Sequence, residues 1–320
     1  MRSYIIRRIL LIIPTVFFVT AIIFLSIRLI PGSVIDVMVA DYESFGGPVT
    51  QQDIQVIKHN LGMDVPVYVQ YARWVDQVVH GNLGTALWAQ HPVIDDIEAR
   101  WPVTAELGIL AIIISQLIAL PIGIYSALRQ NDWGDHLSRS FAIFCIAVPS
   151  FWLATLVIVY PSIWWGYMPS ITLIKFTVDP LGNLKMFIVP AIILGMGMSG
   201  TSMRMTRTMM LEVMRQDYIR TAWAKGLKER IVVMRHALKN ALIPIITITG
   251  QQFSMLVGGS VIIESIFALP GMGLLIINSL NGRDYITFEA CLLLYSVVLV
   301  VVNLITDIGY GFLDPRIHYN

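Results

Sequence analysis

The stretch 107-LGILAIIISQLIALPIGIYSAL-128 decides the fold class of this chain. None of its 22 residues is Asp, Glu, Lys or Arg. An α-helix rises about 1.5 Å per residue, so a helix of this length crosses a hydrocarbon layer about 30 Å thick. We therefore expect this stretch to span a membrane.

The rest of the chain repeats the pattern. Hydrophobic residues make up 56% of it and charged residues only 13%, with a mean hydropathy of +0.70, whereas soluble domains carry about 25% charged residues. Basic and acidic residues are balanced, 22 against 21, which argues against a nucleic-acid-binding protein. The sequence predicts an all-α polytopic membrane protein with six transmembrane helices. The other five charge-free stretches are Ile9–Ile27, Phe141–Trp165, Phe187–Met203, Ala241–Ile263 and Ala290–Thr306.

Two of the six predicted spans are unusual. Ile9–Ile27 follows several arginines, as the apolar part of a signal peptide does, but it is too long for one and no A-x-A cleavage site follows it. We therefore expect a membrane anchor that is retained. Phe187–Met203 is short and rich in Gly and Ser. Such a helix spans a membrane where neighbouring helices pack closely against it.

The basic residues predict the orientation of the chain. In a six-span topology, fifteen Lys and Arg residues lie on the side of the two termini and six on the other side. The positive-inside rule then places both termini in the cytoplasm. The predicted division is a cytoplasmic N-terminus with the first helix (1–30), an extracytoplasmic domain (31–100), a core of helices two to six (101–310, including a cytoplasmic region at 204–242) and a cytoplasmic tail (311–320).

The predicted outer domain is acidic. Residues 31–100 contain three basic and nine acidic residues, a net charge of −6. Gln52–Leu61 and Val67–His80 have helical patterns, and Pro48, Gly62 and Pro66 separate them. We interpret the segment as a folded lid, gate or docking domain. The alternative is a passive solvated loop.

The cytoplasmic region carries a more specific pattern. The helical pattern that begins at Asp217 breaks at Gly226, as glycine does at a helix end, and a second amphipathic stretch covers Glu229–Leu238. Ala222, Ala224 and Gly226 are small, so another protein could approach this backbone closely. The surrounding basic residues suit an acidic cleft. The alternative is an ordinary basic loop that obeys the positive-inside rule.

The spans contain few groups for chemistry. Polar side chains within them must face protein or water, so they are candidates either for lining a pathway or for bonding one helix to another. Cys145 and Cys291 are expected to be apolar packing residues. No His-Glu-x-x-His or Cys-pair pattern predicts a metal site. The candidate pathway residues are Gln116, Ser199, Thr201, Thr247, Gln251, Gln252 and Asn303.

The sequence lacks the complete motifs of three further classes of protein: nucleotide-binding proteins, intramembrane proteases and ion-coupled carriers. The chain has no phosphate-binding G-x-x-x-x-G-K-[ST] and no Gly-Lys dipeptide, so if its function depends on a nucleotide, the nucleotide is expected to bind a partner. Gly197–Gly200 resembles a serine-nucleophile turn of an intramembrane protease, but no histidine lies in the fifth or sixth span. A proton- or sodium-coupled carrier usually has ionisable groups at mid-membrane, and these spans have none.

At residues 217–244 the chain resembles the loop signature of ABC-importer permeases, in which an EAA–x3–Gly turn forms a coupling helix. It is most similar to the dipeptide/oligopeptide/nickel (glutathione-type) permease family, in its first, B-type subunit. Three departures are Arg220-Thr-Ala in place of Glu-Ala-Ala, His236-Ala-Leu-Lys239 in place of the generic Ile-x-Leu-Pro end, and Asn82 where an acidic residue is usual. Further matches are Leu29–Gly32, Leu61–Asp64, Gly81–Gly84, Glu264–Gly273 and Leu313–Arg316.

The resemblance implies residue roles. Those of the coupling segment would contact a partner ATPase, and those near the outer ends of the spans would form a gate or docking surface. Apart from the resemblance, Glu264 is expected near a membrane face, where we interpret it as an interface or subunit-contact residue; the alternative is a substrate contact. The coupling residues are Asp217, Arg220, Thr221, Ala222, Ala224, Lys225, Gly226, Leu227, His236 and Asn240, and the outer residues are Asn82, Leu83, Gly84, Glu264, Phe267 and Pro270.

It also implies a type I ABC importer of the bacterial inner membrane. Its partners would be a second homologous permease, two cytoplasmic ABC ATPases and an extracytoplasmic solute-binding protein, besides membrane lipid. ATP and Mg would bind to the ATPases, and no cofactor would bind to this chain. The chain itself would not be an enzyme. The expected cargo is a di- or oligopeptide or a glutathione-like peptide. Nickel chelates and sugars are the alternatives.

Overall fold

The computed structural model describes residues 2–28, 39, 50–60, 64–166 and 172–313. In this part of the chain the regular structure is helical, apart from one isolated β-bridge between Thr85 and Pro92. The all-α prediction is therefore confirmed. The motifs Leu29–Gly32 and Leu313–Arg316, most of the tail 311–320 and much of 31–49 lie outside the described residues, except for a helix end at Leu313.

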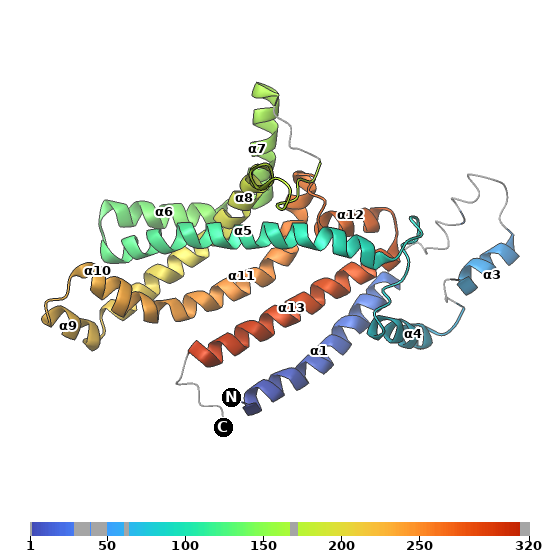
Figure 1. Ribbon diagram of the computed structural model, residues 1–320, viewed down its shortest axis with the longest axis horizontal. Coiled ribbons are helices and arrows are strands. Elements are labelled where there is room, and N and C mark those ends of the chain that lie inside the picture. The colour runs from blue at the N-terminus through green and yellow to red at the C-terminus, as the bar shows by residue number, and fades with distance from the viewer. Residues whose placement is uncertain (1, 29–38, 40–49, 61–63, 167–171, 314–320) are drawn as a thin grey trace. The chain divides into compact units, whose positions relative to one another are not determined.

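The helices follow one another along the chain as Figure 1 labels them. Their bounds are α1 (Arg2–Arg28), α3 (Gln51–Asn60), α4 (Val67–Val79), α5 (Val93–Leu128), α6 (Trp133–Ala147), α7 (Ser150–Trp165), α8 (Pro180–Met214), α9 (Asp217–Ala224), α10 (Glu229–Ile231), the π-helix η1 (Val232–Ala237), α11 (Leu238–Ile266), α12 (Met272–Asn281) and α13 (Tyr285–Leu313).

The chain forms two units. Within the described residues the first is mainly Val103–Gly273 with the end of α13 from Val301, and the second is Ile6–Pro102 with Leu274–Val300. The described part of 31–100 groups with α1 and with Leu274–Val300. The domain division expected from the sequence stays a prediction.

Four helices of the described chain are long and apolar enough to cross a membrane, or five if the bent pair α6–α7 is one span. The four are Val93–Leu128, Pro180–Met214, Glu229–Ser254 and Tyr285–Thr306. They include the second, fourth and sixth predicted spans, and they overlap the fifth, Ala241–Ile263, as far as Ser254. The described apolar stretch in α1, Leu10–Ser26, is shorter. The count of six spans stays a prediction.

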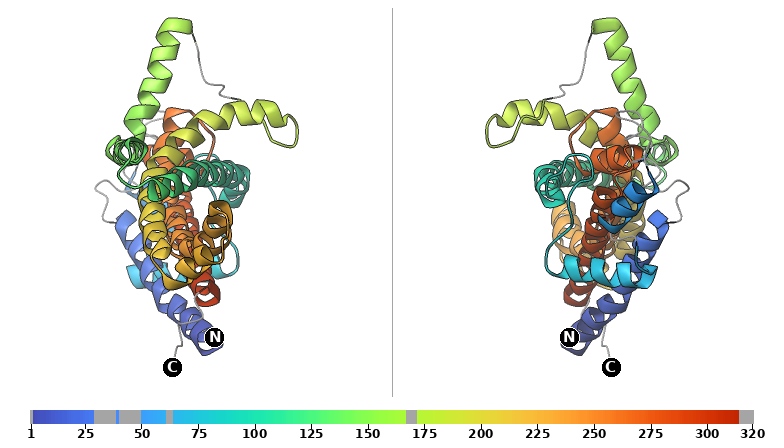
Figure 2. Two further views of the ribbon diagram at one scale, coloured as in Figure 1. Left: turned by 90° about the vertical axis from the view of Figure 1, so that its left-hand side faces the viewer. Right: turned by 90° about the vertical axis from the view of Figure 1, so that its right-hand side faces the viewer.

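The third predicted span, Phe141–Trp165, is not one continuous helix. It is divided between α6 and α7, whose axes differ by 88° (Figures 1 and 2). The break contains Val148 and Pro149, and Pro149 precedes the first residue of α7. Proline lacks an amide hydrogen and disfavours a helical residue before it, so it ends α6. A search for charge-free residues alone does not detect this break.

Glycines let the helices of the first unit pack closely around α8. A Cβ atom added to Gly195 would lie 2.7 Å from the carbonyl oxygen of Ala111 in α5, and one added to Gly200 would lie 2.6 Å from that of Ala142 in α6. Both distances are too short for any larger residue. The prediction that small residues in the fourth span permit close packing is confirmed.

Cys145 is buried in the same interface between α6 and α8, beside Ala142 and Met203. Cys291 is fully buried in the second unit. Both are free thiols, and the prediction that they are packing residues is confirmed.

The second unit contains α3 and α4, which correspond to the two helices that the sequence predicted at Gln52–Leu61 and Val67–His80. The face of α4 that carries Tyr71 and Trp74 packs against Phe24 of α1, with ring centroids 5.2 Å and 5.7 Å apart. Tyr71 also shares a 2.8 Å hydrogen bond with the hydroxyl of Thr20. The apolar pattern of α4 therefore serves packing against α1.

Candidate functional site

The coupling segment 217–240 begins with α9, a short helix held by one buried face. Ile219 is fully buried and Ala222 is 6% exposed. They pack in a hydrophobic cluster with α8, η1 and the start of α11, in which Met210, Val232 and Ala237 are buried. Because this face is fixed, a force applied to α9 acts directly on the helices that precede and follow it.

The opposite face of α9 is open. Arg220, Thr221 and Ala224 are exposed, and Trp223 is 42% exposed. The three small residues predicted to permit close approach differ in their surroundings. Ala222 is buried in the packing, whereas Ala224 and Gly226 remain accessible.

Gly226 ends α9 in the left-handed conformation, with φ of +73°. Its amide donates to the carbonyl of Trp223 at 2.9 Å, and the amide of Leu227 donates to that of Ala222 at 3.4 Å. This is the usual role of glycine one residue beyond a helix cap. A Cβ atom added here would meet nothing within 4 Å, so the space beside Gly226 is open to a partner.

The return from α9 to the membrane is partly π-helical. The segment Val232–Ala237 has a π-helical hydrogen-bond pattern, which is rare and common at functional sites. Asn240 then donates from its side-chain amide to the hydroxyl of Tyr218 at 2.8 Å, which joins α9 to the first turn of α11. His236 is half-buried beside this bond. The sequence reasoning missed Tyr218, for which an exposed aromatic residue in a basic segment was the only signal.

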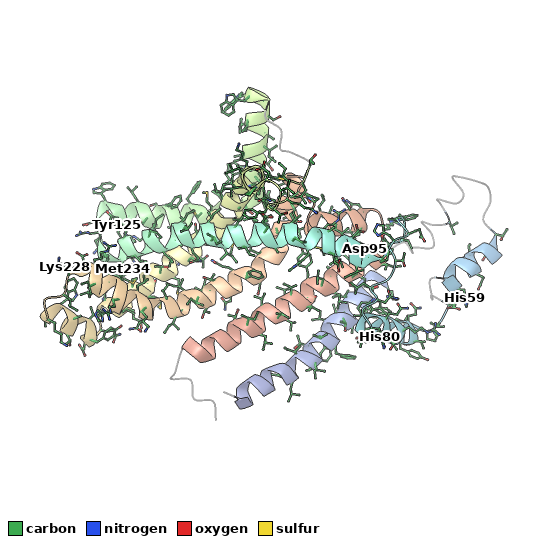
Figure 3. The ribbon with its side chains drawn as sticks, viewed as in Figure 1. His59, His80, Asp95, Tyr125, Lys228 and Met234 are labelled. Carbon is green, nitrogen blue, oxygen red and sulfur yellow. The ribbon has the colours of Figure 1, made fainter. Side chains whose placement is uncertain are left out.

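The surface of this region is positively charged. Figure 3 shows Lys228 and Met234 at this end of the first unit, where both side chains are exposed. The exposed acidic residues are Glu212, Asp217 and Glu229. The exposed basic residues are more numerous and comprise Arg215, Arg220, Lys225, Lys228, Arg230, Arg235 and Lys239.

Two of the predicted pathway residues meet through a third that the sequence reasoning missed. Gln116 of α5 donates to the hydroxyl of Ser202 at 3.3 Å. Gln252 of α11 lies 3.1 Å from the same hydroxyl through its amide nitrogen, which also donates to the carbonyl of Met198 at 2.8 Å. Ser202 is fully buried and Gln252 nearly so. In this conformation Gln252 therefore bonds α11 to α8, the second of the two roles considered for it.

The remaining pathway candidates lie apart. Ser199 is buried and donates to the carbonyl of Met196 at 2.7 Å, which favours packing over a nucleophilic role. Thr201 and Gln251 are exposed. Asn303 is exposed and accepts from Ser254 at 3.3 Å.

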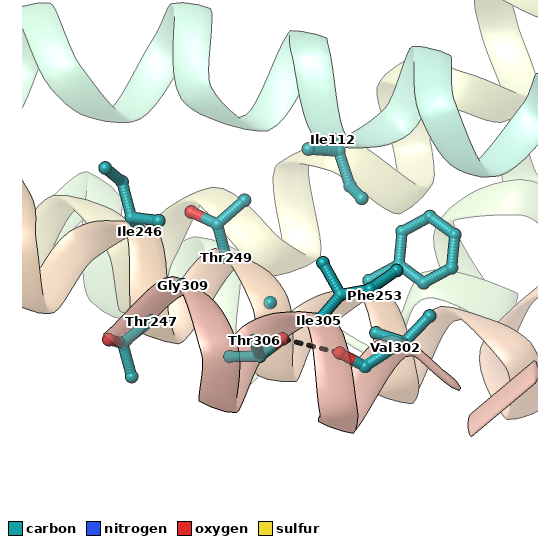
Figure 4. A pocket seen from close by; sticks show the side chains of 10 residues that line it. Ile112, Ile246, Thr247, Thr249, Phe253, Val302, Ile305, Thr306 and Gly309 are labelled. Atoms are coloured by element: carbon teal, nitrogen blue, oxygen red, sulfur yellow. Dashed lines mark hydrogen bonds between the residues drawn. The ribbon is translucent and has the colours of Figure 1, made fainter. Parts of the chain in front are cut away.

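Thr247 lines a cavity of about 450 Å³ between α5, α11 and α13 (Figure 4). Its hydroxyl donates to the carbonyl of Ile243, and those of Thr249 and Thr306 likewise donate within their own helices. The other lining residues are apolar or glycine. In this conformation the cavity thus offers no unpaired hydroxyl donor to a polar substrate.

The turn at Gly81–Gly84 is built into the second unit. The side chain of Asn82 accepts from the amide of Gly84 at 2.9 Å, a bond that an aspartate makes equally well. Gly84 has φ of +90°, and a Cβ atom there would lie 2.6 Å from Ile286. Leu83 is half-buried. Gly81 and Asn82 are both exposed, and Asn82 presents the exposed side chain of this turn.

Glu264 and Phe267 are not surface residues of this chain. Glu264 is fully buried and Phe267 is 3% exposed, while Pro270 is half-buried. The carboxylate of Glu264 accepts from the hydroxyl of Thr104 and from the amide of Gly273, both at 2.7 Å. It therefore holds the turn that follows α11 against α5. In this conformation both side chains take part in internal packing, and their gate or docking role stays a prediction.

A buried ion pair lies outside every set of predicted residues. Asp135 of α6 is fully buried and receives two hydrogen bonds of 2.9 Å from the guanidinium of Arg207 in α8. Nothing in the sequence links positions 135 and 207, because their proximity depends on how α6 packs on α8.

Comparisons with known proteins identify relatives along the whole chain. Residues 119–319 match the family described as binding-protein-dependent transport system inner membrane component, and residues 1–108 match the N-terminal family of the same membrane components. A peptide transport system permease protein of Brucella suis is 39% identical over 320 residues, all of both chains. The glutathione transport system permease protein GsiC of Escherichia coli O6:H1 is 34% identical over 319 residues, again all of both chains.

Solved structures share the fold. The inward-facing methionine ABC transporter MetNI superposes with a TM-score of 0.56 at 15% identity, covering 68% of this chain and 96% of that one. An amino acid ABC transporter with histidines gives a TM-score of 0.53 at 14% identity, covering 68% and 94%. At these identities the likeness concerns the fold alone.

Proposed function

Because the chain belongs to the family of binding-protein-dependent transport system inner membrane components, we propose that it is the permease subunit of an ATP-driven peptide importer. Full-length relatives named for peptide and glutathione transport support a peptide cargo. The alternatives are nickel chelates and sugars.

The observation that carries the proposal is the construction of α9. One face is buried against α8, η1 and α11, while the other face and the space beside Gly226 are open. An ATPase that docks on the open face can move α9 as a rigid body. The buried face passes this movement to the spans, which change between inward-facing and outward-facing packings. ATP drives transport only because it binds the two conformations with different affinity.

The proposed assembly contains a second homologous permease, two cytoplasmic ABC ATPases and an extracytoplasmic solute-binding protein. ATP and Mg would bind to the ATPases, which would perform the hydrolysis. The excess of exposed basic residues around α9 supports a cytoplasmic position for this end of the first unit, within a bacterial inner membrane. Both termini are then cytoplasmic.

Reconstitution of the whole assembly in proteoliposomes tests the function. We expect uptake of a labelled di- or oligopeptide, or of glutathione, that requires both ATP and the solute-binding protein. The solute-binding protein of the assembly is first screened against peptides, nickel chelates and sugars, so that the cargo is chosen by measurement.

The matched control omits ATP or replaces it with a non-hydrolysable analogue. Uptake that proceeds equally without ATP contradicts an ATP-driven importer and favours a secondary carrier. A binding protein that takes only nickel chelates or sugars contradicts the peptide cargo but retains the importer.

A further inference from the structure

The buried carboxylate of Asp135 is the meeting point of three helices. Its Oδ1 accepts from the hydroxyl of Ser126 at 2.5 Å and from Nε of Arg207 at 2.9 Å. Its Oδ2 accepts from the amide of Asn131 at 3.0 Å and from Nη2 of Arg207 at 2.9 Å. The Nε atom of Arg139 lies farther away, 3.5 Å from Oδ1. The node therefore contains the end of α5, the turn after it, α6 and α8.

Close backbone contacts surround this node. A Cβ atom added to Gly123 of α5 would lie 2.7 Å from Cβ of Thr206 in α8, and one added to Gly134 of α6 would lie 2.5 Å from the ring of Tyr125. Helices packed this closely do not slide past one another in small steps. They either rearrange to a different packing or move together as one body. The node and the glycines thus favour a single rigid block of α5, α6 and α8.

Stability alone explains the ion pair poorly. Burying two charges costs desolvation that their attraction often only offsets, and apolar residues of the same volume commonly stabilise a protein as well. The bidentate pair adds geometric specificity, because the planar guanidinium and the carboxylate form two parallel hydrogen bonds in only one relative placement of the two helices. Here it fixes α6 against α8 about two turns before α8 ends and leads into α9.

We propose that Asp135 and Arg207 are positioning residues for transport, which make the end of α5 and the helix α6 follow every movement of α8 and α9. The proposal rests on the function proposed above. When an ATPase moves α9, Arg207 carries Asp135 with it, and the α5–α6 turn follows through Ser126 and Asn131. Without the pair α8 moves while α6 lags, so ATP is hydrolysed with little substrate transported.

The first experiment measures substrate transported per ATP hydrolysed by the complete importer in proteoliposomes. For Arg207→Gln we expect this ratio to fall about tenfold or more, with hydrolysis within about twofold of wild type. Arg207→Lys keeps the positive charge but cannot form the two parallel hydrogen bonds of a guanidinium, so we expect the transport ratio to fall less than in Arg207→Gln. The comparison variant is Arg139→Gln, which removes a partly exposed guanidinium that forms a 3.5 Å ion pair with Asp135 without a hydrogen bond, and should lower the ratio much less than Arg207→Gln.

The second experiment measures the link itself, independently of any cargo. Spin labels are placed at two exposed positions, Leu137→Cys on α6 and Glu212→Cys on α8. We expect one narrow distance that is the same without nucleotide and with ATP in the wild-type importer, and a broadened, nucleotide-dependent distance in Arg207→Gln. Asp135→Asn, which keeps the side-chain shape, replaces Arg207→Gln if the latter does not assemble.

Two results would overturn the proposal. One is an unchanged transport ratio in Arg207→Gln. The other is a parallel loss of transport and hydrolysis with an unchanged label distance, as expected of a pair that only stabilises the fold. Failure of the proposed function looks different, because wild-type protein would then take up no peptide while the label distances still report whether α6 follows α8.

Discussion

Gly226 combines two properties, a left-handed backbone conformation and free space beside its Cα atom. Its φ of +73° lies in the left-handed region, which an L-residue enters at a cost of about 1–2 kcal/mol. The empty space around its missing side chain is a separate property, because nothing of this chain lies within 4 Å. The first property shapes the end of α9, and the second permits close approach by another protein.

Substitution of Gly226 separates these two properties. Gly226→Ala carries the backbone strain with little bulk, so we expect a fold destabilised by about 1–2 kcal/mol and substantial remaining uptake. Gly226→Trp adds a large side chain to the docking space, so we expect ATP-dependent uptake to fall to background although the protein still inserts. Uptake by the reconstituted importer and copurification of the ATPases measure both effects. Wild-type coupling in Gly226→Trp would contradict the docking role.

At the scale of elements, α9 depends on tertiary packing. With 8 residues it is too short to be stable alone in water, since isolated helices need about 12–15. Its buried face supplies the missing stability through Ile219 and Ala222. The helix is therefore only as rigid as the hydrophobic cluster beneath it.

Truncation of that face should loosen α9 selectively. Ile219→Ala removes a fully buried side chain, and we expect a loss of about 2–5 kcal/mol in the free energy of local opening. Faster amide hydrogen exchange in residues 217–226 and weaker copurification of the ATPases report it. The control Met234→Ala shortens a side chain that is 55% exposed and should change opening by about 0.5 kcal/mol or less. Equal exchange in both variants would contradict the anchoring role of Ile219.

At the scale of the whole molecule, the open question is the path of the bent pair α6–α7. If the pair crosses the membrane once, three crossings separate α4 from α9, and the two helices lie on opposite sides. If the pair enters and returns, two crossings separate them and they lie on the same side. Both native cysteines are buried, so an introduced cysteine can be labelled with little background.

Labelling with a membrane-impermeant maleimide decides the path. Tyr68→Cys and Lys225→Cys both place the thiol at an exposed position. We expect Tyr68→Cys to react in intact cells and Lys225→Cys only after permeabilisation, as the positive-inside rule predicts. Reaction of both in intact cells would mean that α6–α7 does not cross. Reversed sidedness would contradict the cytoplasmic position of α9.

Several elements could be predicted from sequence because their signals are local. The coupling segment combines an amphipathic pattern with a helix-ending glycine, and α9 ends where that pattern breaks. The outer helices α3 and α4 likewise follow their apolar spacing and proline boundaries. The break at Pro149 was also local, and it was missed because only charges were searched in that stretch.

Roles that depend on neighbours could not be predicted in this way. Glu264 and Phe267 matched an outer-surface role by position, but packing buries both. Gln252 suited a pathway as well as a helix contact until Ser202 was found beside it. In each case the deciding partner lies tens of residues away or more, and no local pattern specifies it.

Local sequence patterns suffice to predict that the chain is helical, lies in a membrane and carries a short helix that ends before Gly226 within a basic segment. Charge, hydropathy and helix periodicity depend on residues that are close together in the chain. Only the tertiary structure decided which polar groups meet: Asp135 with Arg207, Tyr218 with Asn240, and Glu264 with Thr104. These pairs are 72, 22 and 160 residues apart in sequence. The physical reason is that a buried polar group needs a partner, and close helix packing determines which one lies within reach.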